Sequence, residues 1–127
     1  MAATNKNARK KAVVDALNKA RSGELHAIYQ YMNQHYNLDD LNYPKLASKM
    51  RAIAIDEMRH AEEFAERIKD LDGEPTAEFS EKVVKAQDIR EIYRFDANLE
   101  DATSDMYNGF WALCRENGDM VSASLFE

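Results

Sequence analysis

Ala54-Ile55-Asp56-Glu57-Met58-Arg59-His60-Ala61 places a carboxylate and an imidazole three residues apart in a strongly helical context. On an α-helix this spacing puts Glu57 and His60 about one turn apart on the same face, where both can bind one metal ion. Most such pairs lie on the solvated surface of a helix. The interpretation therefore depends on the face that the pair occupies and on whether other helices supply further ligands.

Apolar residues continue this segment in both directions with helical spacing. The predicted helix runs from about residue 44 to 71: Pro44 suits the first turn of a helix, and Gly73 with Pro75 suits a helix end. Its packing face reads Leu46, Met50, Ile53, Glu57, His60, Phe64, Ile68 and Leu71. Glu57 and His60 thus belong to the face that is expected to be buried.

Two further helices each carry a glutamate among the apolar residues of the packing face. The first is predicted over about 8–37 and contains Glu24, and the other is predicted over about 84–116 and contains Glu100. The residues between, 72–83, have no periodic pattern and are long enough to cross the length of a bundle. A buried carboxylate without a partner costs several kcal/mol, so three of them in three packing faces indicate a shared binding site.

Glu24 and Glu57 are also expected at one level of the bundle. Each lies about 13 residues from the turn that joins the first two helices, or about 20 Å at 1.5 Å per residue. In an antiparallel hairpin the two side chains therefore lie at the same level.

Composition limits the class of protein. The chain has 127 residues with 4 Gly and 2 Pro, which fits one helical domain. Its net charge of −6 argues against a nucleic-acid partner and suits a protein that attracts cations. The single cysteine, Cys114, is compatible with a reducing compartment, and there is no apolar run long enough for a membrane span or signal peptide. We therefore expect a cytoplasmic protein without a membrane partner.

The first and third helices repeat one another. Tyr31 follows Glu24 by seven residues, and Tyr107 follows Glu100 by seven. The same offset applied to Glu57 and His60 predicts a second carboxylate at position 133 and a histidine at 136. The turn at Asn117-Gly118 and a capping Asp119 start a fourth helix, but the sequence stops at residue 127. Either the chain is part of a longer one, which we favour, or the second half of the site is missing.

These residues carry a resemblance to the bacterioferritins. It rests on Gly23-Glu24-Leu25-His26-Ala27 and on 55–62, and continues more weakly through 96–101 to 125–127. The resemblance implies an all-α fold, a ferritin-like four-helix bundle with a long crossover between the second and third helices and a fourth helix truncated in this chain. It further implies that 1–127 form a single ferritin-like di-iron domain, incomplete at the C-terminus, of a homo-oligomeric 24-subunit cage.

The resemblance also implies roles for individual residues. Glu24 and Glu100 match terminal ligands of the two irons, Glu57 matches a bridging carboxylate, His60 matches the imidazole ligand, and Tyr31 matches the tyrosine beside the site. Met58 matches the axial ligand of a haem, b-type or a variant, that lies between two subunits on a two-fold axis. On a helix, residue 58 is rotated about 100° from residue 57 and can face outward.

The implied function is iron storage and detoxification. A ferroxidase oxidises Fe(II) with dioxygen or peroxide and stores the Fe(III) mineral in the hollow cage. One alternative is a di-iron peroxidase of the rubrerythrin kind. Another is a non-catalytic haem-binding bundle or assembly partner, because the second Glu-x-x-His is missing from the sequence.

Other residues of ligand type receive structural interpretations. His26 is about 200° around the helix from Glu24, and we expect it on the surface or between subunits. His35 is about 16 Å along the axis from Glu24, too far to share a metal ion. We expect Cys114 to be a small core residue.

Overall fold

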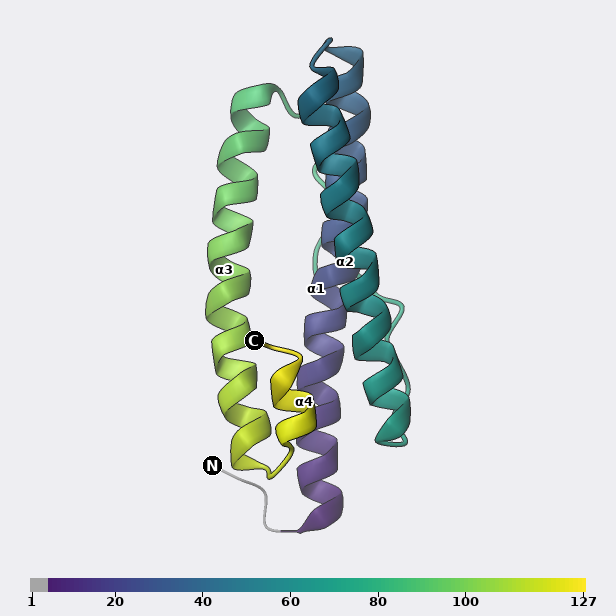
Figure 1. Cartoon of the computed structure of the whole chain (residues 1–127), viewed down its shortest axis with the longest axis vertical. Coiled ribbons are helices and arrows are strands. Elements are labelled where there is room, and N and C mark those ends of the chain that lie inside the picture. Colours follow the sequence, from purple (N-terminus) through teal and green to yellow (C-terminus); the bar gives the residue numbers. More distant parts are fainter. Residues whose placement is uncertain (1–4) are drawn as a thin grey trace.

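The computed structural model describes residues 5–127 and is all-helical over that range. Within these described residues four helices follow one another: α1 (Lys6–Asp40), α2 (Pro44–Asp70), α3 (Ile89–Glu116) and the short α4 (Met120–Ser124). Figure 1 shows α1 and α2 as an antiparallel hairpin, α3 upright beside it and α4 folded back between α3 and α1. The expected helical bundle with a shortened fourth helix is confirmed, and the first four residues of the expected domain lie outside the described range.

Local sequence signals determine where these helices begin. Asn5 accepts a hydrogen bond from the Ala8 amide at the start of α1, and Pro44 occupies the first turn of α2. Asp88 and Glu91 form a capping box at α3. These caps satisfy backbone amides that have no partner within their helix.

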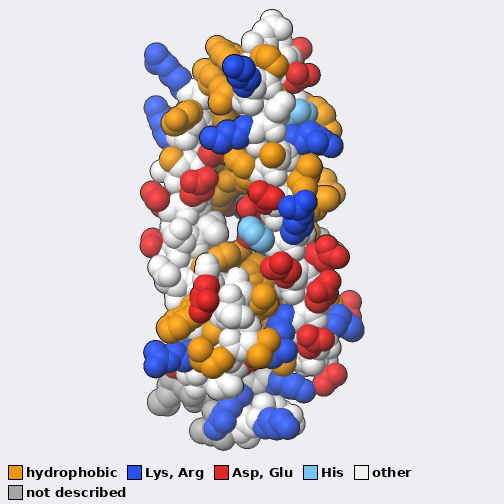
Figure 2. All heavy atoms as spheres, in the orientation of Figure 1, with side chains coloured by type: hydrophobic (Ala, Val, Ile, Leu, Met, Phe, Trp, Pro, Cys, Tyr) orange, Lys and Arg blue, Asp and Glu red, His pale blue; other side chains and the backbone are white. Residues whose placement is uncertain are grey.

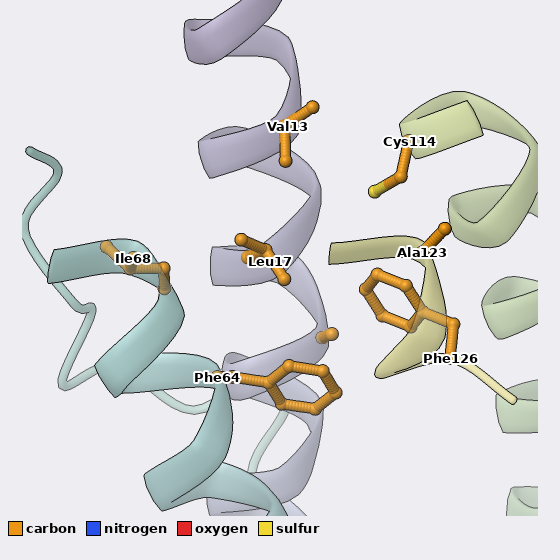
Figure 3. Close-up of a cluster of buried hydrophobic side chains, with 8 residues drawn as sticks. Val13, Leu17, Phe64, Ile68, Cys114, Ala123 and Phe126 are labelled. Carbon is orange, nitrogen blue, oxygen red and sulfur yellow. The ribbon is translucent and has the colours of Figure 1, made fainter. Parts of the chain in front are cut away.

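The largest buried apolar cluster lies in the lower half of the bundle. Figure 3 shows side chains from α1, α2, α3 and the C-terminal segment converging there. The cluster consists of Val13, Leu17, Ala20, Phe64, Ile68, Cys114, Ala123 and Phe126. Burial of each large apolar side chain stabilises the fold by about 1.5–3 kcal/mol. The interpretation of Cys114 as a core residue is confirmed, since its side chain is fully buried.

Residues 71–88, which we call the strap, connect α2 to α3 along the outside of α1. The Gln30 side-chain amide donates to the Val84 carbonyl and accepts from the Val84 amide, at 2.9 Å each. Asn18 forms the same kind of two-point contact, with the Glu74 carbonyl and the Thr76 amide. Side chains of α1 thus replace the strand partner that an extended segment would otherwise need.

The strap also explains why α3 begins later than predicted. The expected start near residue 84 is wrong by about one turn, because α3 begins at Ile89. Val84 is held in the strap by Gln30, and Ala86 has φ of 58°, in the left-handed region that a helix cannot continue through. Val83 and Val84 therefore belong to the crossover and not to the helix.

The face between α3 and the α1–α2 hairpin is hollowed halfway along the bundle. Figure 2 shows this hollow bordered by acidic side chains, with apolar side chains above and below it. None of the described helices is both long and apolar enough to cross a membrane.

Replacement of Gln30 by Ala should detach the strap locally. The variant loses both contacts with Val84, and we expect the free energy of unfolding to fall by about 1–3 kcal/mol. Hydrogen exchange should show faster exchange of the Val84 amide. The matched control is Asn33→Ala on the same helix, whose side chain accepts a hydrogen bond from Asn37 and not from Val84. Unchanged Val84 protection in the Gln30 variant would contradict this account of the strap.

Candidate metal centre

Three side chains of the α1–α2 hairpin offer metal-ligand atoms to one point. His60 Nδ1 lies 3.8 Å from Glu24 Oε2 and 3.7 Å from Glu57 Oε1. All three ligand atoms are within 4.8 Å of one another. Two carboxylates and one imidazole that converge in this way form a ligand set that fits a divalent transition metal.

The burial of these three residues is graded. Glu24 is 3% exposed, the Glu57 side chain is 22% exposed, and the His60 side chain is 50% exposed. The group therefore opens toward the hollow face and closes against α1.

Glu24 is the most unusual of the three residues. Its Oε1 accepts a hydrogen bond from the Tyr107 hydroxyl of α3, while its Oε2 is buried without a partner. Burial, followed by the neighbouring Glu57 carboxyl group, raises the pKa of Glu24 to about 9. In the metal-free protein at neutral pH, Glu24 is therefore protonated, and a bound cation would replace that proton.

A cavity of about 280 Å³ extends from this group to α3. Glu24, Tyr31, Glu57, Glu100 and Tyr107 are among the residues that line it. The structure thus places Glu100 on the same cavity, but as an exposed residue outside the group of three converging ligands.

Tyr31 is buried on the α1 side of the cavity, 4% exposed. Its pKa is raised by burial and then by the Asp96, Glu57 and Glu100 carboxylates. Asp96 is a neighbour that the sequence did not single out as a site residue. Burial raises its pKa to about 6, against a 2.7 Å hydrogen bond from Gln34 Nε2 that lowers it.

The remaining residues of ligand type lie apart from the centre. The expectation that His26 is at the surface is wrong: its side chain is fully buried under the strap, near Glu81 and Phe95. The helix position alone could not show this, because the strap covers that face of α1. His35 Nδ1 donates to the Ala47 carbonyl at 2.6 Å, a structural role. Met58 is 53% exposed.

The contact between Tyr107 and Glu24 is the feature that sequence reasoning missed. The seven-residue spacing showed that Tyr107 repeats Tyr31, but not which carboxylate it reaches. The sequence did offer one signal for this contact: Tyr107 lies on the packing face of a helix that also carries a glutamate, at the same spacing as Tyr31.

Comparisons with known proteins agree with this geometry. The family model of the ferritin-like domain matches residues 14–127. The bacterioferritin of Desulfovibrio desulfuricans is 58% identical over 125 residues, which are 98% of this chain and 70% of that protein. The bacterioferritin BfrA of Mycobacterium tuberculosis is 37% identical over 116 residues, which are 91% of this chain and 72% of that protein.

Solved structures give the same result. An X-ray structure of the D. desulfuricans bacterioferritin, whose diiron site is described in different catalytic states, matches with a TM-score of 0.96 at 58% identity and covers 98% of this chain and 72% of that one. M. tuberculosis BfrA matches with a TM-score of 0.86 at 32% identity, over 99% of this chain and 76% of that one.

The raised pKa of Glu24 predicts how the stability of the metal-free protein depends on pH. Between pH 4.5 and about 9 the folded state binds the Glu24 proton more tightly than the unfolded state, so the free energy of unfolding falls as pH rises through this window. Glu24→Gln has no proton to lose. Relative to the wild type, it should gain roughly 5 kcal/mol between pH 5 and pH 9, because over most of this range the folded wild type holds a proton that the unfolded chain has lost.

Urea unfolding in the presence of a chelator measures this difference. Glu62→Gln, an exposed glutamate on α2, serves as the control and should follow the wild-type curve. A Glu24→Gln curve parallel to that of the wild type from pH 5 to 9 would show that Glu24 has an ordinary pKa.

Proposed function

This chain belongs to the bacterioferritin family of ferritin-like proteins, and on that premise we propose that it is a ferroxidase that oxidises Fe(II) for storage as an Fe(III) mineral. The observation that supports this proposal most strongly is the convergence of Glu24, Glu57 and His60 on one point, next to a cavity that Glu24 and Glu57 line. The family supports iron oxidation and storage in general; the assignment of particular residues is our proposal.

Fe(II) is the substrate that the three residues would bind. Carboxylates with an imidazole suit Fe(II), and a carboxylate can bridge two ions. Glu24 and His60 would each bind through one atom, and Glu57 lies beside both. Glu100, which lines the cavity from α3, would bind a second ion. The net charge of −6 favours the approach of Fe(II).

Oxidation removes one electron from each Fe(II) and transfers it to dioxygen or peroxide as the oxidant. The residues of the chain would bind the ions and release or donate protons. Glu24 would release its proton when a cation binds, because the cation then compensates the negative charge of the buried carboxylate. Tyr31 lines the cavity, and its raised pKa keeps the phenol protonated. It would donate a hydrogen bond to a ligand of the iron or supply an electron.

The product would be stored in a homo-oligomeric cage with a haem between two-fold related subunits. Met58 suits this role because the residue is 53% exposed and lies outside the metal-ligand group, although it is next in sequence to Glu57. A thioether is a known axial ligand of haem iron, and the haem would supply electron transfer.

Glu57→Ala tests the ferroxidase proposal. Loss of this carboxylate removes a ligand from the centre, and we expect the initial rate of Fe(III) formation after an oxygen pulse to fall by at least about 100-fold. The measurement follows anaerobic loading with Fe(II). Glu63→Ala, an exposed neighbour on α2, should oxidise Fe(II) at the wild-type rate. Equal rates in all three proteins would refute the assignment.

Met58→Leu tests the haem proposal. Leucine keeps the apolar character but lacks the sulfur, so the variant should lose the haem absorption band while its helical content stays unchanged. Met120→Leu, at an equally exposed methionine (54%), should retain the band. Full haem retention in Met58→Leu would exclude Met58 as the ligand.

A further inference from the structure

The two oxygens of the Glu24 carboxyl group have different surroundings. Oε1 accepts the hydrogen bond of the Tyr107 hydroxyl. Oε2 has no hydrogen-bond partner, is buried, and lies 3.8 Å from His60 Nδ1. One oxygen is therefore engaged by α3, and the other is presented to the metal-ligand group of the α1–α2 hairpin.

The Tyr107 ring is held in place by aromatic neighbours. Its centroid lies 5.9 Å from that of Phe64 and 5.2 Å from that of Phe126, both in edge-to-face geometry. Phe64 and Phe126 themselves belong to the main core cluster and stack on each other at 5.3 Å. These contacts with the core hold the Tyr107 ring in one orientation.

A carboxylate that coordinates a metal has a choice between one oxygen and two. If Oε1 accepted no hydrogen bond, the Glu24 carboxylate could turn and bind the metal through both oxygens, because rotation about its terminal torsion costs little energy. A donor already on Oε1 makes that rotation cost a buried hydrogen bond to a charged group. The contact therefore favours binding through Oε2 alone, which leaves a coordination position for another ligand.

We propose that Tyr107 is a positioning residue of the metal centre, which holds Oε1 of Glu24 so that this glutamate binds the metal through Oε2 only. The proposal rests on the proposed function, because it assumes that Glu24 is a metal ligand. It adds a residue of α3 to a ligand group that comes from α1 and α2.

The test uses Co(II) as a spectroscopic probe, titrated into the whole chain without oxygen. Tyr107→Phe keeps the ring between Phe64 and Phe126 but lacks the donor. We expect Co(II) binding to weaken about tenfold, because the buried carboxylate of Glu24 loses its hydrogen bond. The visible absorption of bound Co(II) should also change, because Glu24 can then coordinate through both oxygens. Tyr36→Phe, an exposed tyrosine on the same helix as Glu24, should match the wild type in both readouts.

A double-mutant cycle separates positioning from a general structural effect. In a Glu24→Ala background, Tyr107→Phe should cause no further loss of Co(II) affinity and no further spectral change, because its partner is gone. An equal loss in both backgrounds would overturn the proposal. So would an unchanged affinity and spectrum of Tyr107→Phe in a protein whose wild type binds Co(II). Failure of the wild type itself to bind Co(II) would instead overturn the proposed function, and this inference with it.

Discussion

The burial of the Glu24 carboxyl group is the constraint on which the site depends. An uncompensated buried carboxylate costs several kcal/mol, yet only one of the Glu24 oxygens has a hydrogen-bond partner. In the metal-free protein a proton compensates the charge, as the pKa of about 9 indicates. A divalent cation bound between Glu24, Glu57 and His60 would compensate it instead. The binding energy and the folding energy of this chain are therefore linked through one residue.

The remainder of the fold positions that residue. The α1–α2 hairpin brings the three ligand atoms to one level, and the strap, held by side chains of α1 such as Gln30, leads the chain back to the start of α3. From there α3 presents Tyr107 to the centre across the cavity, supported by the aromatic core. The hollow between α3 and the hairpin (Figure 2) keeps the centre accessible.

Helical periodicity and turn chemistry predicted most of the fold and the central part of the candidate site. Glu24, Glu57 and His60 could be found because a glutamate among apolar residues is costly, and because equal distances from one turn put them at one level. The start of α3 and the burial of His26 could not be found, since both depend on the path of the strap. Long-range contacts of this kind leave no periodic pattern in the sequence.

The most direct test of the central claim is a crystal structure of the chain loaded anaerobically with Fe(II), with anomalous scattering recorded at the iron absorption edge. The account predicts an iron peak within bonding distance of Glu24 Oε2, Glu57 Oε1 and His60 Nδ1. A peak elsewhere, with these three side chains unchanged and Glu24 still bearing only its contact with Tyr107, would contradict it.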